Sequence, residues 1–433
     1  MTIEATSAGD TTSQTPERHA NNWVVLLLAF TLAGVVESQA FGHLNAFRPL
    51  YLQQLGVPPQ NIATWTGVLA ALGFVIGLPL LPFWGVWADR YSRKLIIVRS
   101  AYVEGVLFTV AALAPNVWVL AGAQLLGGFV FGNTGVMLAM LADVTPRKRL
   151  GMAVGIASAG FPIGSSIGPF IGGLIAQGPG IRALLGMDAA ASVLIGVMLT
   201  LVVREEARKA VTGETVGGML RGAVHAIVSS PVVLRLFVLY FLAMYGYSLA
   251  SPFIPILLQQ WYQGDPNKLA GVIGTTLTLS GIAMAIMTPV WGRIGDVVGR
   301  WFVLPLCLAG MAVGMLIAAL VQTLLPLQLD IIGMGLFQAG IGTTVIALLA
   351  LLSPEERRAP ILNFSLLPSQ LSWFFGPITG AALARISISL PFFCSAIALV
   401  AALVLASLLA MRFRGSGAAE GAHAEDPSGA SVS

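Results

Sequence analysis

Long apolar stretches joined by short polar loops make up most of this chain. A helix needs about 20 apolar residues to cross the roughly 30 Å hydrocarbon core of a bilayer. Twelve stretches reach that length, at approximately 23–45, 62–84, 95–113, 118–141, 151–176, 183–203, 232–258, 269–291, 301–322, 327–351, 361–384 and 388–411. Because only 10% of the residues are charged, against about 25% in soluble domains, the sequence predicts an all-α membrane protein with twelve transmembrane helices.

The basic residues predict how these helices are oriented. With the N-terminus in the cytoplasm, all but four of the 23 lysine and arginine residues fall on the cytoplasmic side, the exceptions being Arg48, Arg182, Lys268 and Arg385. Cytoplasmic loops of membrane proteins carry such an excess. We therefore expect a multi-pass protein of the cell (inner) membrane with both termini cytoplasmic. This placement explains the net charge of +4 without a nucleic-acid partner.

A polar segment divides the chain into two halves. Residues 204–231 form the longest polar interruption, with six apolar stretches on either side. We expect a cytoplasmic linker there, with a short amphipathic helix around 217–228. Residues 1–21 show no cleavable signal sequence. The other predicted units are a disordered cytoplasmic N-tail at 1–21, six-helix bundles at 22–203 and 232–411, and a disordered cytoplasmic C-tail at 412–433.

The two halves repeat one another. The sequence GVWADRYSRK at 85–94 recurs as GRIGDVVGRW at 292–301, in the same loop of the second half. Two other pairs match at an offset of 208 residues, against 207 for this loop, namely Gly168-Pro169 with Gly376-Pro377, and Thr145-Pro146 with Ser353-Pro354. Three matches at offsets of 207 and 208 indicate a duplicated six-helix unit. Secondary transporters built from two such units bind substrate at the midplane between them.

The repeated loop resembles a motif of the major facilitator superfamily. The matching residues are Gly85, Asp89, Arg90, Arg93 and Lys94 in the first half, with Gly292, Asp296, Gly299 and Arg300 in the second. The resemblance covers nearly the whole chain, and it departs from the family at Ser92 and Val297. It implies the major facilitator fold of two pseudo-symmetric six-helix halves, with this loop as a conformational gate. If Arg90, Arg93 and Lys94 were only topology anchors, the acid repeated at Asp296 would be unexplained.

The fifth apolar stretch carries a second motif. Gly160, Gly164, Gly168 and Gly172 form a ridge of small residues at helical spacing, which permits close helix packing. Pro169 removes a backbone donor and bends the helix. The stretch also resembles the motif of the antiporter branch of the superfamily, through Gly155, Gly164, Gly168, Pro169, Gly172 and Gly173. That resemblance implies export in exchange for an ion, whereas the ridge alone requires only tight packing.

Two glutamates lie inside the predicted helices. Glu37 falls well within the first stretch and Glu104 near the middle of the third. An ionised carboxylate costs a few kcal/mol at the bilayer centre, so both are candidates for carrying a proton. The alternative is a structural acid with a partner. By the same topology we expect Asp188 and Asp330 at the interface, and Asp143 to pair with the arginines of the loop motif.

One position departs from the usual drug exporters of the superfamily. Many of them have an arginine four residues before a glycine in the fourth helix, and here Gln124 precedes Gly128 at that spacing. The usual arginine-centred coupling to protons is therefore not expected. Glu37 or Glu104 would have to couple differently, or transport is not driven by protons.

The remaining candidates are amides and aromatics within the spans. His43 is a candidate protonation switch, although a lone histidine near a helix end is more often simply hydrogen-bonded. An apolar site with few charges favours a lipophilic or cationic small molecule over a sugar phosphate. The substrate or proton-coupling candidates are Glu37, Glu104, Gln39, His43, Gln124, Asn133, Tyr245, Tyr247, Gln338, Asn363, Gln370 and Trp373.

The function expected from these features is secondary active transport rather than enzyme catalysis. No Gly-x-x-x-x-Gly-Lys loop is present for ATP, and the four histidines have no metal-ligand spacing. We expect a monomer in the lipid bilayer that needs no cofactor and exports a multidrug-type small-molecule substrate, driven by a proton or other ion gradient. The alternatives are a uniporter or symporter for a sugar, metabolite or lipid-like solute, and a non-transporting membrane sensor or enzyme.

Overall fold

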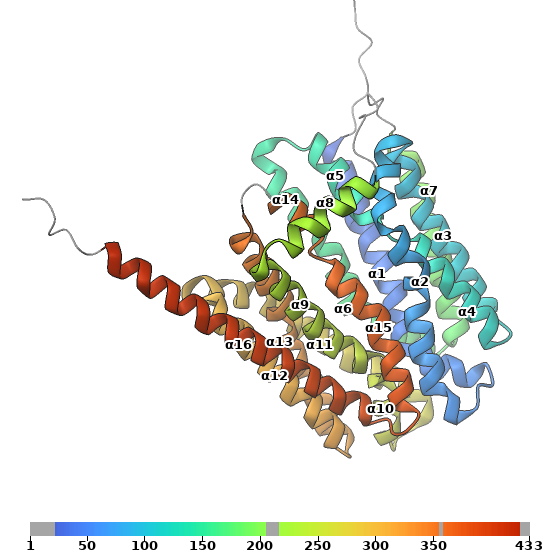
Figure 1. The fold of residues 1–433 in the computed structure, drawn as a ribbon. Coiled ribbons are helices and arrows are strands. Elements are labelled where there is room, and N and C mark those ends of the chain that lie inside the picture. Colours follow the sequence, from blue (N-terminus) through green and yellow to red (C-terminus); the bar gives the residue numbers. More distant parts are fainter. Residues whose placement is uncertain (1–21, 205–215, 355–357, 425–433) are drawn as a thin grey trace, which may run out of the picture.

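The computed structural model describes residues 22–204, 216–354 and 358–424, and the regular structure in them is helical (Figure 1). The N-terminal tail at 1–21 and residues 205–215, 355–357 and 425–433 lie outside the described residues. The first half contains α1 (Trp23–Gln54), α2 (Pro59–Arg90), α3 (Arg93–Leu113), α4 (Val117–Leu126), the 3-10 turn η1 (Gly127–Phe129), α5 (Asn133–Val144), η2 (Arg147–Arg149), α6 (Leu150–Gln177) and α7 (Ile181–Val202).

The second half follows the linker helix α8 (Val216–Val228), which confirms the helix predicted around 217–228. Its elements are α9 (Pro231–Ala250), η3 (Ser251–Phe253), α10 (Ile254–Trp261), η4 (Pro266–Lys268), α11 (Leu269–Val297), α12 (Arg300–Leu320), α13 (Leu324–Leu352), α14 (Arg358–Asn363), α15 (Leu367–Ala384) and α16 (Leu390–Ala424). The last helix continues past residue 411 to Ala424, so the expectation of a disordered C-tail from residue 412 is wrong over 412–424, and 425–433 lie outside the described residues.

Eleven helical segments among the described residues are long and apolar enough to cross a membrane. The twelfth predicted stretch, 361–384, is divided between α14 and α15. Ser369, Gln370 and Ser372 make α15 more polar than the other spans. The protein is thus a multi-pass integral membrane protein.

Two predicted spans are interrupted rather than continuous. The fourth is broken between α4 and α5, where Gly132 adopts a φ of +89° that a side chain would disfavour. The seventh is broken at η3, between α9 and α10. Non-helical backbone at membrane depth is tolerated only where protein or a water-filled cavity surrounds it. The break before α5 therefore marks an interior position in the first half.

The repeated loops end their helices in different ways. In the first half, Ser92 caps α3, with its hydroxyl accepting a hydrogen bond of 2.9 Å from the Leu95 amide. In the second, Gly299 precedes α12 with a φ of +107°. A serine cap and a positive-φ glycine are alternative ways to begin a helix after a tight turn. This difference explains why Ser92 can occupy the position of the usual glycine.

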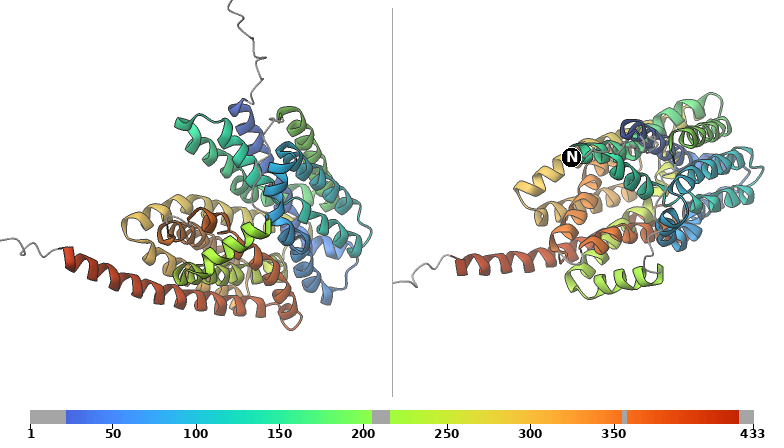
Figure 2. Two further views of the ribbon diagram at one scale, coloured as in Figure 1. Left: turned by 45° about the horizontal axis from the view of Figure 1, so that its top comes forward. Right: turned by 90° about the horizontal axis from the view of Figure 1, so that it is seen from above.

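The two halves touch mainly through α6 with α11 and α2 with α15, and α1 also contacts α10 and α11. Several of these contacts lie away from the N-terminal end of α1. Gln53 donates a hydrogen bond of 3.0 Å to Gln259, and a Cβ on Gly173 would lie 2.8 Å from the Ala270 carbonyl oxygen. The ribbons diverge toward the opposite end, where α5, α8 and α14 lie (Figures 1 and 2).

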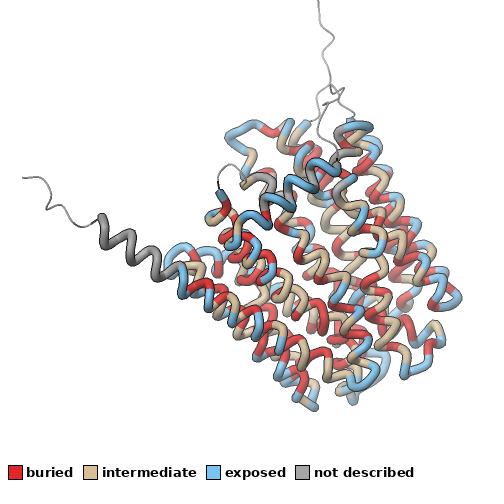
Figure 3. Tube along the Cα trace, in the orientation of Figure 1, coloured by how far each residue is buried: buried red, intermediate tan, exposed pale blue. Residues whose placement is uncertain are grey.

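Burial follows the arrangement expected of a protein in lipid. Buried residues gather between the helices, and exposed ones run along the outer faces (Figure 3). Large apolar side chains such as Trp118, Leu194 and Ile397 are exposed on these faces. An apolar exterior of this kind suits a hydrocarbon surrounding.

Candidate functional site

Glu37 of α1 lies beside the break in the fourth span. Asn133, the first residue of α5, donates a hydrogen bond of 2.7 Å from its Nδ2 to Oε2 of Glu37. Asn133 is buried, whereas Glu37 keeps partial exposure. The N-terminus of a helix favours negative charge nearby. Glu37 is thus an acid with one fixed partner and some access to the surroundings.

Glu104 of α3 is more deeply enclosed. Its side chain is 3% exposed, and its Oε1 is buried without a hydrogen-bond partner among the described residues. It lies within electrostatic reach of Glu37 and Asp188, and Ser192 of α7 lies beside it. Ionising Glu104 would place an unpaired charge in an apolar interior among other acids. The neutral acid is therefore the stable form in this arrangement.

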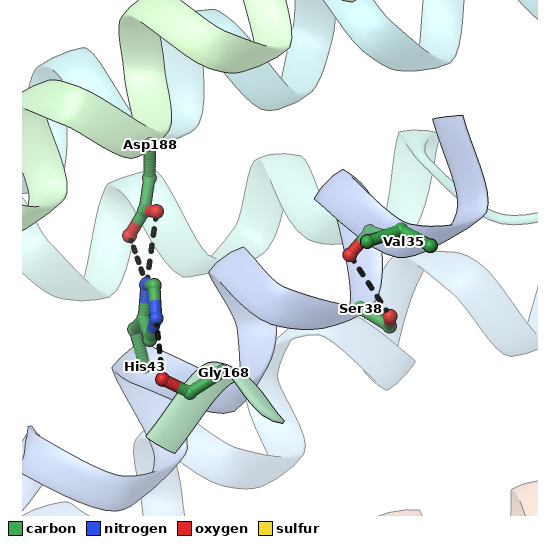
Figure 4. A network of polar contacts seen from close by, with 5 residues as sticks. All are labelled: Val35, Ser38, His43, Gly168 and Asp188. Atoms are coloured by element: carbon green, nitrogen blue, oxygen red, sulfur yellow. Dashed lines mark hydrogen bonds and ion pairs between the residues drawn. The ribbon is translucent and has the colours of Figure 1, made fainter. Parts of the chain in front are cut away.

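His43 of α1 joins three helices (Figure 4). Its Nδ1 lies 2.9 and 3.0 Å from the two carboxylate oxygens of Asp188 on α7. Its Nε2 lies 2.8 Å from the carbonyl oxygen of Gly168 on α6. Asp188, expected near the membrane interface, is buried, because α7 packs between α1 and α3 and turns this carboxylate inward. His43 is hydrogen-bonded at both ring nitrogens, as the alternative interpretation of this residue expected.

The glycine ridge of α6 lies against α1. A side chain at Gly164 would meet the Val35 carbonyl oxygen, and one at Gly172 would lie 2.5 Å from Cδ2 of His43. Gly168 lies beside Gln39, whose side chain is half-buried. Since lipid supplies no hydrophobic force between helices, such close approach is what holds these two together.

Three other residues of the antiporter-like motif have different surroundings. Gly155 has open space where a Cβ would lie, so helix packing does not require glycine there. Gly173 and Pro169 face the second half, where the Pro169 carbonyl contacts Gly274 of α11. The motif therefore serves both the first half and the contact between halves.

Each repeated loop holds an ion pair among its described residues. Arg93 contacts Asp143 at 2.7 Å, which confirms the pairing expected for Asp143. Arg300 of α12 contacts Asp296 of α11 at 2.6 Å across the turn between the two helices. Arg90 is exposed and Lys94 half-buried, while Gly292 has open space around it and Gly299 begins the turn into α12. The surroundings of Gly85 and Asp89 lie outside the described residues.

Two arginines lie inside the helix bundle, Arg48 buried and Arg99 half-buried. Arg48 falls beyond the first predicted span, which ends at residue 45, but α1 continues to Gln54 and encloses it at 3% exposure. It donates to Asn45 at 2.6 Å. Arg99 of α3 lies 3.5 Å from the ring centroid of Trp84. The helical periodicity of the sequence continues beyond residue 45. This signal could have placed Arg48 inside the helix.

In the fourth span, Gln124 occupies the position at which many drug exporters of the superfamily have an arginine. It is buried, and its Nε2 donates a long hydrogen bond of 3.4 Å to the Leu69 carbonyl. This bond ties α4 to α2. The structure thus gives Gln124 a packing contact between two helices.

Several second-half candidates lie together. Tyr247 and Trp373 meet edge to face with ring centroids 5.9 Å apart, and the Tyr247 hydroxyl faces Gln338. Tyr245 stacks on Phe241 instead, and Gln370 is half-buried on α15. The side chain of Asn363 lies outside the described residues. Tyr247, Trp373 and Gln338, from α9, α15 and α13, form an aromatic and amide cluster.

A groove lies in the second half, away from the aromatic and amide cluster. A cavity of about 290 Å³ lies between α12 and α13, lined by Gly310, Gly314, Asp330, Gly333 and Phe337 among others. Asp330, expected at the interface, is partly buried there, and its Oδ2 has no partner among the described residues. Among all the residues that the structure describes, no group of three His, Cys, Asp or Glu side chains could hold a metal ion.

Comparison with known proteins gives consistent results. The family model "Major Facilitator Superfamily" matches residues 30–263 and 236–429. The multidrug resistance protein MdtG of Yersinia enterocolitica is 29% identical over 364 residues, covering 83% of this chain and 87% of that protein. MdtG of Escherichia coli K12 is 28% identical over 369 residues, or 84% and 88% of the two chains.

A solved structure shows the same fold. A bacterial homolog to the human lysosomal transporter Spinster, in an inward-facing and occupied conformation, matches with a TM-score of 0.70. The match covers 90% of this chain and 96% of that one, at 16% sequence identity. At this identity the likeness concerns the fold alone.

Proposed function

This chain belongs to the Major Facilitator Superfamily and is a transporter of its multidrug branch, and from that premise we propose that it exports lipophilic or cationic small molecules in exchange for protons. The observation that carries the proposal is the partly exposed Glu37 held by Asn133, beside the enclosed acid Glu104. A carboxylate exposed to a substrate site can hold either a cation or a proton. Competition between the two would couple their movements.

The aromatic and amide cluster supports the substrate class. Tyr247, Trp373 and Gln338 offer ring faces and an amide rather than a set of cations. Aromatic faces attract cations and also bind apolar surfaces. Arg48 donates to Asn45, and Arg99 contacts Trp84 and donates to the Phe131 carbonyl, so both arginines already contact protein groups and do not favour a phosphorylated substrate.

The arrangement of the halves supports alternating access. Cross-half contacts between Gln53 and Gln259, and between α6 and α11, lie away from the N-terminal end of α1. If the N-terminus is cytoplasmic, as the basic residues predict, these contacts close the outer end. Rocking of the two halves would then separate them and close the inner end.

Drug accumulation in inverted membrane vesicles tests this proposal. A fluorescent lipophilic cation is added to vesicles with an acidic interior, with or without an ionophore that collapses the pH gradient. Uptake that requires both this protein and the gradient is expected for an exporter. Uptake that equilibrates equally without the gradient would instead indicate a uniporter. A thermal-shift screen of the purified protein identifies the compounds to use.

A further inference from the structure

His43 lies between two hydrogen-bond acceptors, and this limits where its protons can be. The Gly168 carbonyl oxygen can only accept, so Nε2 of His43 must carry a proton. Nδ1 faces both oxygens of Asp188. A single titratable proton therefore distinguishes two states of the pair, and it lies on the short contact between Nδ1 and the carboxylate.

Loss of that proton would make the contact repulsive. The lone pair of Nδ1 would then face an ionised carboxylate with no donor between them. His43 is 1% exposed and Asp188 5%, so no bulk water screens the two groups. Buried polar groups left without a donor are costly. The deprotonated pair would therefore be more stable if the two groups moved apart.

The segment of α6 that His43 holds also makes contact with the second half. The Phe170 amide donates a hydrogen bond of 3.0 Å to Oγ1 of Thr278 on α11. Between these two points, the Pro169 carbonyl contacts Gly274. Three consecutive residues of α6 thus link the His43–Asp188 pair to the closed contact between the halves.

The charged groups around the pair bear on which contact a change in protonation can break, and we infer that it is the contact between His43 and Asp188. Glu104 of α3 acts on Asp188, whereas Arg182 of α7 donates to the Ala114 carbonyl and Arg48 to Asn45. Helices α6 and α10 carry no charged residue. On α1 itself, Glu37 accepts a hydrogen bond from Asn133 and interacts with Glu104. The remaining charged side chains described on helices packed against α1 or α7 lie toward the opposite end of the bundle: Arg90, Arg93, Lys94, Arg99, Asp143, Arg293 and Asp296.

We propose that His43 and Asp188 form a proton-binding site that controls the contact between α6 and α11. With the proton bound, the pair anchors α6, and the halves stay closed at the end where α6 contacts α11. Without it, the pair separates and the closed contact is weakened. This proton sets which end of the transporter is closed and is separate from the proton that Glu37 exchanges for substrate; its role in export rests on the proposed function. The direction agrees with an exporter that takes up a proton while its outer end is open.

Distance measurement between the halves tests the site without any substrate. Spin labels are placed on the full chain at Gln54→Cys and Gln260→Cys, two exposed positions beside the Gln53–Gln259 contact, with Cys307 and Cys394 replaced by alanine. Pulsed electron paramagnetic resonance in nanodiscs then gives the closed fraction from about pH 5 to pH 9, a range that brackets histidine titration. The ratio of closed to open protein should fall with rising pH, by up to about tenfold per pH unit for one linked proton.

Substitutions assign the titration to the pair. His43→Gln and Asp188→Asn should flatten the pH dependence, whereas His225→Gln, at an exposed histidine of α8, should leave it unchanged. The double variant Glu37→Gln/Glu104→Gln should also retain it. That variant decides the matter even if the pair variants do not fold. Loss of the pH dependence there would assign the titration to the glutamates and overturn the proposal.

The parent protein alone can also overturn the proposal. A closed fraction that does not change with pH means that no linked proton is present, whatever the variants do. Because no substrate is added, this outcome is separate from the vesicle assay. A pH-dependent distance without gradient-driven drug uptake would preserve the site and contradict the proposed function instead.

Discussion

Asn133 donates a hydrogen bond of 2.7 Å to Glu37, and this bond joins the first helix to the point where the fourth span is broken. The break at Gly132 places the start of α5 opposite α1. An acid in the first helix is thereby held by a side chain that a continuous fourth helix would orient differently. The pair is the basis for the first two predictions.

Replacing Glu37 by glutamine should abolish the response of transport to a pH gradient. The amide keeps the size of the side chain and cannot exchange a proton, so substrate binding can persist. Gradient-driven uptake into inverted vesicles and substrate-induced thermal shift are measured on the same variant. Unchanged coupling in Glu37→Gln would leave Glu104 as the acid that carries the proton.

Removing the partner should have a smaller effect than removing the acid. Asn133→Ala deletes a hydrogen bond to a carboxylate, which contributes about 1.5–3 kcal/mol in typical measurements. We expect roughly a tenfold or larger loss of affinity for a cationic substrate, with coupling retained. Gln60→Ala, at an exposed amide near the start of α2, is the control. Equal affinity in both variants would show that Asn133 does not position Glu37.

The glycine ridge of α6 should tolerate alanine at one position and not at another. Gly164→Ala places a methyl group against the Val35 carbonyl, and overpacking of this kind costs typically about 1–3 kcal/mol. Gly155→Ala enters open space and should be neutral or slightly stabilising. Thermal unfolding of both purified variants is the measurement. A lower melting temperature for Gly155→Ala than for Gly164→Ala would contradict the packing described for this helix.

The loop motif should matter for transport more than for stability. A largely exposed ion pair such as Arg300 with Asp296 contributes only about 0.2–1 kcal/mol. Asp296→Asn and its repeat Asp89→Asn should therefore reduce transport while leaving abundance and melting temperature nearly unchanged. Transport rates and membrane abundance are measured together. Normal transport in both variants would reduce the loop to a topology anchor.

Much of the architecture could be predicted because apolar length and charge sidedness are properties of each segment alone. The linker helix and the Arg93–Asp143 pair are examples. The ends of the helices were harder to predict from the sequence. Helix α1 extends past its apolar stretch, since Arg48 finds partners in Asn45 and in the Thr66 carbonyl and so remains inside.

The site was harder to predict because it depends on which faces of distant helices meet. His43 and Asp188 lie on the first and last helices of their half, and their contact depends on how α1 and α7 are rotated. A single sequence gives the depth of each residue along its helix, but not which neighbouring helix its side chain faces. Asp188 was therefore placed near the interface from its depth alone. The break before α5 was also missed, because the glycines of the fourth span occur within an apolar stretch.

Proton movement during transport tests the central claim most directly. Purified protein is reconstituted into liposomes with an acidic interior, and a pH-sensitive dye inside reports proton exit when a lipophilic cation is added outside. We predict substrate-dependent alkalinisation of the interior with the parent protein and none with Glu37→Gln. Substrate uptake by the parent protein without any change in internal pH would contradict proton-coupled export.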